Sequence, residues 1–135
     1  MRALVIVNPI AGKGRTRTIG ACVDLAKSSL SANDFEPDVR VTTRPADAYR
    51  FSREAAAAKV DLVIAWGGDG TVNGAATGVA GTSIPLAIIP GGSGNGLARD
   101  LLIPFDPTAA FTIAATGATR VIDAGGLHGQ LFFNV

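Results

Sequence analysis

The chain is poor in the residues that build disulfides and metal cages, and it has no long apolar run. Its 135 residues include one cysteine, Cys22, and one histidine, His128. Neither an intrachain disulfide nor a zinc site built from cysteine or histidine can therefore form. No window reaches the ~18 consecutive apolar residues that a membrane-spanning helix requires, and the start of the chain lacks the apolar region of a secretory signal. We expect a cytoplasmic protein, and contact with a membrane surface remains open.

The chain also has no excess of positive or negative charge. The chain has 12 Lys and Arg residues against 11 Asp and Glu residues, a net charge of +1. This balance excludes the broad basic footprint that is typical of nucleic-acid binding. Glycine, in contrast, is abundant and falls largely in three clusters, at 12–14, 67–70 and 91–96. Glycine clustered between apolar runs indicates turns that face a ligand rather than disorder.

The apolar pattern predicts strands that alternate with helices. The expected strands are 3–7, 35–43, 61–65 and 86–89, and the expected helices are 16–30, 46–59, 72–79, 95–102 and 107–116. This alternation is typical of βαβ units and a parallel sheet. We therefore predict an α/β domain over residues 1–117. Three residue types of low abundance carry no chemistry in this interpretation: Cys22 is expected in the core, Trp66 under a loop rather than stacked on adenine, and His128 on the surface.

The end of the chain has a different pattern. The runs 119–124 and 130–135 predict a β-hairpin whose second strand is truncated at an apolar end. We assign residues 118–135 to a second, mostly missing β domain. An unpaired apolar edge invites pairing with another copy, so we expect self-association through residues 119–135 and a homo-oligomer.

Each glycine cluster follows a predicted strand. In parallel sheets, ligands bind beyond the carboxyl ends of the strands, so the three clusters are expected to converge on one edge. The second cluster is the most informative, because Gly67, Gly68 and Gly70 surround one charged side chain, Asp69, just before Thr71. We expect a helix to start near Thr71, where free N–H groups and the helix dipole favour an anion.

The carboxylate of Asp69 fits three roles in such a turn: a Mg²⁺ ligand, a base that takes a proton from a nucleophile, or a contact to a ribose hydroxyl. That combination indicates phosphoryl transfer. A tight strand-to-helix connection is the alternative, but it does not explain the density of glycine.

The other two clusters are less specific. Asn8, Gly12, Lys13, Gly14 and Arg15 predict either a phosphate loop or a solvated turn, and they do not form a G-x-x-x-x-G-K-[ST] loop. In the third cluster, the short polar side chains of Ser93 and Asn95 are suited to phosphate or ribose oxygens, or to capping the next helix. The remaining candidates there are Gly92, Gly94 and Arg99.

Together these clusters resemble the catalytic domain of the diacylglycerol kinase family, which includes sphingosine kinases and bacterial lipid kinases. The segments that carry the resemblance appear in order: Asn8-Pro9 with Gly12 and Gly14, then 67–71 with Asn73, then Pro90 with 92–95 and 97–99. The resemblance implies a three-layer α/β sandwich with a mainly parallel sheet, similar to NAD kinases and phosphofructokinases. It also implies the ATP-binding half of a kinase that phosphorylates a lipid hydroxyl, of diacylglycerol or of a sphingoid type.

By that resemblance, ATP would be contacted by Asn8, Gly68, Thr71, Gly92, Ser93 and Asn95. Asp69 would sit near the γ-phosphate and Mg²⁺, either as the base or with the base supplied by the second domain. The lipid would bind through the missing domain, so the chain alone is expected to be inactive. Gly74 stands where the family usually has Glu, and Gly96 where many bacterial members have Asp. A NAD kinase-like enzyme and a non-catalytic nucleotide-binding module are the alternatives.

Overall fold

The computed structural model describes residues 1–9, 18–91, 95–119, 123–127 and 130–134, the last two ranges by their backbone alone. The elements along the chain are β1 (Arg2–Val7), α1 (Ile19–Ser31), β2 (Glu36–Val41), α2 (Asp47–Ala57), β3 (Leu62–Gly67), α3 (Asp69–Val79), β4 (Leu86–Pro90), α4 (Gly96–Asp100), α5 (Pro107–Thr116), β5 (Asp123–Leu127) and β6 (Gln130–Asn134).

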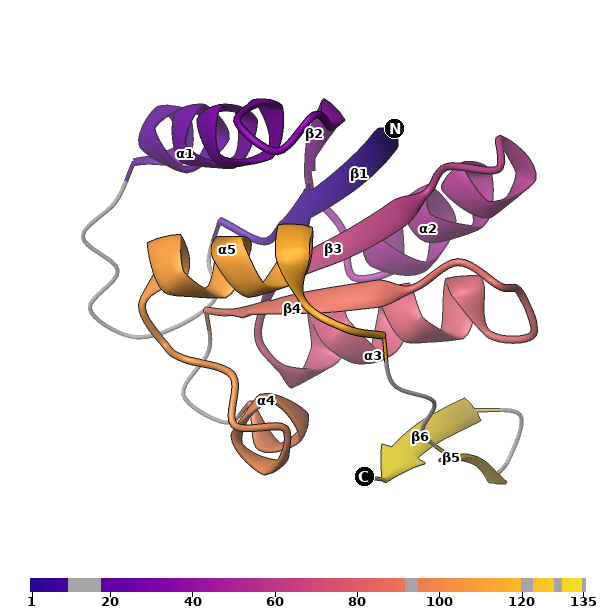
Figure 1. Ribbon diagram of the computed structural model, residues 1–135. Coiled ribbons are helices and arrows are strands. Elements are labelled where there is room, and N and C mark those ends of the chain that lie inside the picture. The colour runs from indigo at the N-terminus through magenta and orange to yellow at the C-terminus, as the bar shows by residue number, and fades with distance from the viewer. Residues whose placement is uncertain (10–17, 92–94, 120–122, 128–129, 135) are drawn as a thin grey trace.

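The first four strands form one parallel sheet in the order β2-β1-β3-β4 (Figure 1). Val5 of β1 lies opposite Val39 of β2 and Ile64 of β3, and Ile64 lies opposite Ala87 of β4. β5 and β6 pair with each other in antiparallel register. The predicted parallel α/β fold and the hairpin are therefore confirmed, whereas the domain boundary at residues 117 and 118 stays a prediction.

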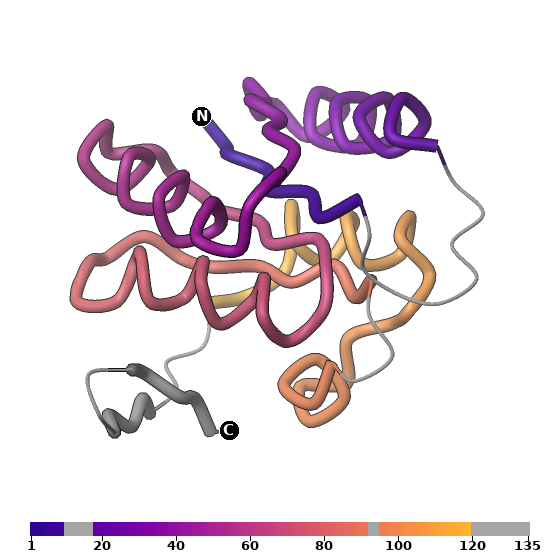
Figure 2. The backbone as a smooth tube through the Cα atoms, turned by 180° about the vertical axis from the view of Figure 1, so that it is seen from behind, coloured from indigo at the N-terminus to yellow at the C-terminus, as the bar shows by residue number. Residues whose placement is uncertain are grey.

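Helices cover both faces of the sheet. Successive residues of β1 alternate between two hydrophobic clusters: Val5 packs with residues of α1 and α5, and Leu4 packs with residues of α2 and α3. Figure 2 shows α2 and α3 side by side on one face, with α5 behind the sheet. A strand buried on both faces needs apolar residues throughout, which explains the continuous apolar runs in the sequence. The expected three-layer sandwich is confirmed.

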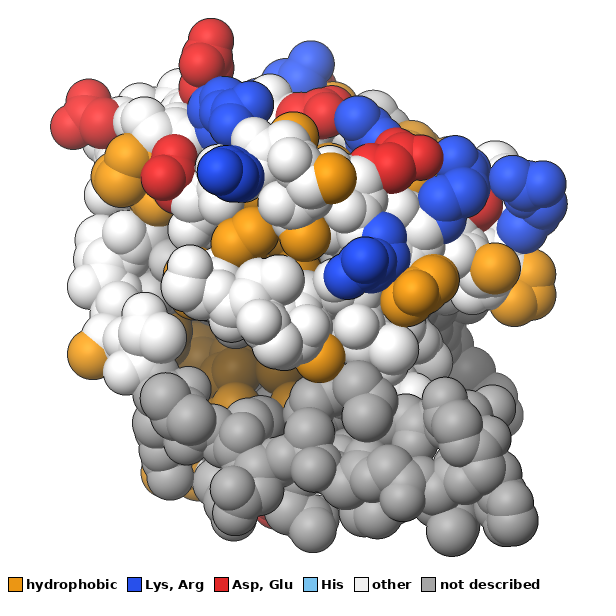
Figure 3. Space-filling model, turned by 90° about the vertical axis from the view of Figure 1, so that its right-hand side faces the viewer, with side chains coloured by type: hydrophobic (Ala, Val, Ile, Leu, Met, Phe, Trp, Pro, Cys, Tyr) orange, Lys and Arg blue, Asp and Glu red, His pale blue; other side chains and the backbone are white. Residues whose placement is uncertain are grey.

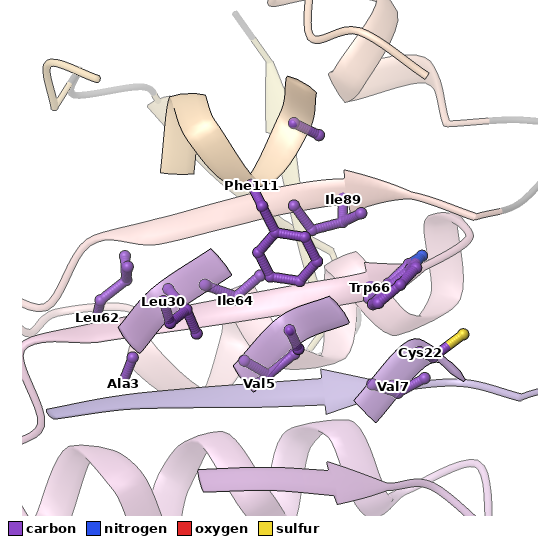
Figure 4. Close-up of a cluster of buried hydrophobic side chains, with 12 residues drawn as sticks. Ala3, Val5, Val7, Cys22, Leu30, Leu62, Ile64, Trp66, Ile89 and Phe111 are labelled. Carbon is purple, nitrogen blue, oxygen red and sulfur yellow. The ribbon is translucent and has the colours of Figure 1, made fainter. Parts of the chain in front are cut away.

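Cys22 belongs to the core, as expected, and Trp66, which was expected under a loop, belongs to the same cluster. The Trp66 ring meets the edge of Phe111 with 5.3 Å between ring centroids and an interplanar angle of 78°, and only 4% of Trp66 is exposed. Figure 4 shows both rings within the cluster that β1, β3, β4, α1 and α5 share. Cys22 on α1 is buried in the same cluster. His128 lies outside the described residues.

The predicted start of the third helix is wrong. α3 begins at Asp69, three residues before the expected start at Val72, and β3 continues to Gly67. Gly68 occupies the N-cap position, and its carbonyl accepts the first helical hydrogen bond from the Val72 N–H at 3.1 Å. Glycine has a low helix propensity, so Gly70 argued against a helix at this position and the first turn of α3 was not predicted. Asp69 is consequently a helical residue, not a residue of an extended loop.

α2 and α3 approach each other closely. A Cβ added at Gly74 would lie 3.1 Å from the Ala48 Cβ and 3.3 Å from the Tyr49 backbone nitrogen. A Cβ added at Gly78 would overlap the Ser52 hydroxyl and lie 2.8 Å from the Ser52 Cβ. The small residues of α3 therefore set the distance between the two helices. A side chain at position 74 would start in this contact.

The corner between β2 and α2 is held by a buried carboxylate. The side chain of Asp47 is only 2% exposed. It accepts hydrogen bonds from the backbone N–H groups of Thr43 at 2.8 Å and Arg44 at 3.0 Å, and it pairs with Arg50 at 3.1 Å. The Thr43 N–H, the Arg50 guanidinium and the Arg44 N–H hold the pKa of Asp47 well below its usual value, against the opposing effect of burial.

The depressed pKa predicts acid-sensitive stability. Because the folded state favours the ionised form, Asp47 contributes stability above its unfolded pKa of about 4 and loses this contribution as the pH falls toward the folded pKa. Asp47→Asn keeps the size of the side chain but removes its charge. We expect a lower urea midpoint for this variant at pH 7 and a smaller difference from the wild type at pH 3. Equal differences at the two pH values would contradict the assignment.

Candidate active site

The described ends of three strands meet at one edge of the sheet. The Asn8 N–H, directly after β1, donates to the carbonyl of Trp66 at 2.9 Å, and the Gly91 N–H, directly after β4, donates to the carbonyl of Gly67 at 3.0 Å. The starting points of all three glycine clusters therefore lie side by side at the carboxyl edge (Figure 1), as expected. Gly12, Lys13, Gly14, Arg15, Gly92, Ser93 and Gly94 lie outside the described residues.

Asn8 and Thr71 connect the first cluster to the second. The Asn8 side-chain amide donates to the Thr71 hydroxyl at 3.2 Å. Thr71 is buried in the first turn of α3. A Cβ added at Gly67 would lie 2.6 Å from the Thr71 Oγ1, so glycine at position 67 is required by internal packing. Asn8, Gly67 and Thr71 therefore pack against one another at the carboxyl edge of the sheet.

Asp69 connects the second cluster to the third. It is the first residue of α3 and is exposed. Its Oδ1 accepts a hydrogen bond from the backbone N–H of Gly96 at 3.0 Å, across 27 positions of sequence. A carboxylate at the start of a helix is stabilised by the helix dipole, so α3 supports the negative charge of Asp69. The structure thus brings a carboxylate to the point where β3 and the third cluster meet.

At two positions of the site, neither the packing of the chain nor its backbone conformation requires glycine. Gly70 and Gly96 are in the first turns of α3 and α4, and a Cβ added at either would meet nothing within 4 Å. Neither residue has a positive φ angle. Glycine in a helix costs about 1 kcal/mol relative to alanine, so internal packing and backbone conformation both allow a better residue. Glycine at these two positions is suited to a ligand that approaches the backbone N–H groups closely.

The remaining residues of the third cluster differ in position. Asn95 is buried at the N-cap position of α4, in the left-handed region with φ of 43°, and its side chain makes no capping hydrogen bond. Capping by the side chain, one of the two roles considered for Asn95, is therefore not what the structure shows. The Arg99 guanidinium stacks on the Phe105 ring, 4.7 Å from its centroid. Arg99 therefore lies on α4 and contacts the connection between α4 and α5 through Phe105.

The residues present fit a magnesium ion held mainly by a phosphate ligand. Within the described ranges, no three His, Cys, Asp or Glu residues are grouped as a metal cage. Mg²⁺ usually takes one or two carboxylates and completes its octahedral coordination with water and substrate phosphates. Asp69 offers one carboxylate at the right edge of the sheet for that arrangement.

The structure adds one segment that sequence reasoning did not include. The Thr42 N–H donates to the carbonyl of Val7 at 2.8 Å, so the corner after β2 adjoins the end of β1. Thr42 was expected inside the strand 35–43, whereas β2 ends at Val41. No glycine marks this corner in the sequence.

A groove lies at the opposite end of the sheet. Its volume is about 440 Å³, and it is lined by the starts of β1 and β2 and the end of α2, including Arg2, Pro37, Glu54 and Ala58. Figure 3 views this end of the molecule, where basic and acidic side chains are interspersed. The Arg2 guanidinium donates to the Ala58 carbonyl. We do not assign this groove to the active site, because ligands of parallel α/β sheets bind at the carboxyl ends of the strands.

Comparison with known proteins identifies the family. The family model for the diacylglycerol kinase catalytic domain matches residues 2–127. The chain belongs to the diacylglycerol kinase catalytic domain family. The match covers all three glycine clusters, so the residues of the site fall within the catalytic domain family segment.

Relatives in this family are found among bacterial lipid kinases. A diacylglycerol kinase of Bacillus subtilis is 37% identical over 99% of this chain and 44% of its own length. A Pseudomonas putida protein named as a YegS-like lipid kinase is 40% identical over 82% of this chain and 38% of its own length. A crystal structure of a diacylglycerol kinase from Bacillus anthracis has a TM-score of 0.81 and 34% identity, and it covers 97% of this chain and 45% of its own. The chain therefore spans less than half the length of these relatives.

In the described part of the chain, no helix combines the length and the apolar character needed to cross a bilayer.

Proposed function

We propose that this chain is the ATP-binding part of a lipid kinase, which transfers the γ-phosphate of ATP to a lipid hydroxyl. The observation that carries the proposal is the open space over Gly70 and Gly96, on either side of Asp69. Gly70 allows the phosphates of a nucleotide to reach the N-terminus of α3 at the carboxyl edge of the sheet. Membership of the family favours a lipid kinase over a NAD kinase-like enzyme.

The residues of the chain supply positioning and charge stabilisation, which is what phosphoryl transfer requires from a protein. Bound ATP with Mg²⁺ supplies the phosphoryl group, and a lipid hydroxyl accepts it. The backbone N–H groups at the start of α3 hold phosphate oxygens, and Gly67 and Gly91 let the two turns lie close together. Asp69 would hold Mg²⁺ or take the proton of the attacking hydroxyl. Lys13 and Arg15 of the first cluster offset phosphate charge.

The lipid contacts are proposed to come from segments beyond this chain. A lipid chain needs an apolar pocket, whereas the groove found in the described part is lined by charged side chains at the wrong end of the sheet. The relatives are more than twice as long as this chain, which leaves room for a lipid-binding domain. We therefore propose that the chain alone binds nucleotide without turnover, and that the intact protein meets its lipid at a membrane surface.

The test is phosphate transfer by the intact protein. Radiolabelled ATP is offered with diacylglycerol, with a sphingoid base and with NAD in separate assays. We expect label in a lipid, and a loss of at least about tenfold in turnover for Asp69→Asn, because the variant removes the negative charge that would hold Mg²⁺ or take the proton of the attacking hydroxyl. The matched control is Asp100→Asn, another exposed carboxylate, at the end of α4, with turnover expected within about twofold of the wild type.

Three outcomes would replace the proposal. Label in NAD would identify a NAD kinase-like enzyme. ATP binding by the intact protein without transfer to any acceptor would identify a non-catalytic nucleotide-binding module. Undiminished transfer by Asp69→Asn would remove the charge of Asp69 from the mechanism.

A further inference from the structure

The segment that joins β4 to α4 is attached at both ends to the turn between β3 and α3. At its start, the Gly91 N–H donates to the Gly67 carbonyl at 3.0 Å. At its end, the Gly96 N–H donates to Asp69 Oδ1 at 3.0 Å. The first bond joins two backbones and belongs to the sheet. The second bond is made by the side chain of Asp69, so a substitution at this position can remove it without changing the sheet.

α4 is held from below by its apolar side chains, because Ala98 lies in a core cluster and Leu97 and Leu101 pack against that cluster. The helix contains five residues, and a helix of that length is unstable without tertiary contacts. Asn95 enters it in the left-handed region, with φ of 43° and ψ of 48°, and without a capping hydrogen bond from its side chain. Asparagine is one of the few residues with a Cβ that adopt this conformation readily. Ala98 anchors the helix in the core below, whereas the bond to Asp69 holds its exposed N-terminus.

We infer that Asp69 is a positioning residue, which holds the N-terminus of α4 beside the phosphate site proposed at the start of α3. This inference rests on the proposed nucleotide site. It concerns the oxygen atom of Asp69 as a hydrogen-bond acceptor, whereas the roles of base and metal ligand concern its charge. The two contributions are separable, because an asparagine side chain keeps an acceptor oxygen and loses the charge.

The experiment compares Asp69→Ala with Asp69→Asn in the 135-residue chain. The first readout is hydrogen exchange of the Gly96 amide without nucleotide. The second is ATP affinity in EDTA, where no metal contributes. We expect about tenfold faster exchange and about tenfold weaker ATP binding for Asp69→Ala, the effect of losing one hydrogen bond to a charged acceptor at an exposed site. Asp69→Asn is expected to restore both values to within about threefold of the wild type.

The control is Asp100→Ala, which removes a carboxylate from the other end of α4 and should change neither readout. Unchanged Gly96 exchange in Asp69→Ala would overturn the inference, and so would an Asp69→Asn variant as impaired as Asp69→Ala in both readouts. If the wild type fails to bind ATP, the proposed function fails. The exchange of Gly96 then decides by itself whether Asp69 holds α4, because that measurement needs no nucleotide.

Discussion

Gly78→Ala is expected to destabilise the protein by about 2–3 kcal/mol, the range for overpacking a well-filled interface. The added Cβ would overlap the Ser52 hydroxyl, lie 2.8 Å from the Ser52 Cβ and lie 3.0 Å from the Tyr49 carbonyl oxygen. Rotation of the hydroxyl relieves only the first contact, so α2 and α3 must separate. Urea denaturation measures the loss, as a fall in midpoint of about 1 M or more.

A second substitution in the same interface, at Ser52, should relieve the clash caused by Gly78→Ala. Ser52→Gly removes both the Oγ and the Cβ that the new methyl group would meet. We expect a double-mutant cycle of Gly78→Ala and Ser52→Gly to show a favourable coupling of about 1 kcal/mol or more, within the range for residues in contact. A wild-type midpoint for Gly78→Ala would show that the two helices do not pack at the distance described above.

The buried strands could be predicted from the sequence, but the contact between α2 and α3 could not. The apolar runs of β1, β3 and β4 predicted buried strands correctly, because a parallel sheet covered on both faces needs apolar residues at consecutive positions. Gly74 and Gly78 gave no such signal. Each allows a residue of α2 to come close, and no local sequence pattern specifies which residue of another helix will face it.

The candidate site was predictable to a similar extent. The position of each glycine cluster after a strand was sufficient to place Asn8, Gly67 and Gly91 at one edge, since parallel strands share the direction of their carboxyl ends. The start of α3 at Asp69 was missed, because two glycines lower the local helix propensity. The bond between Asp69 and Gly96 was also missed, because it depends on the left-handed entry into α4 at Asn95.

Gly70→Ala should move stability and function in opposite directions. The new Cβ meets nothing within 4 Å, and alanine favours the helical backbone of α3, so we expect the free energy of unfolding to rise by about 0.5–1 kcal/mol. The same methyl group would occupy the space proposed for the phosphates. We expect weaker ATP binding by the chain and a loss of about a hundredfold in turnover by the intact protein, the usual effect of displacing a reacting group by about 1 Å.

Gly20→Ala is the matched control, because Gly20 is the second residue of α1 as Gly70 is of α3. A Cβ added at Gly20 would come no closer than 4.0 Å to Thr18 Oγ1. We expect a similar gain in stability for this variant and no change in ATP affinity. Urea midpoints and calorimetric titration with ATP measure the two effects in parallel. A Gly70→Ala protein that gains stability and still binds ATP as the wild type does would show that the open space over α3 is not the phosphate site.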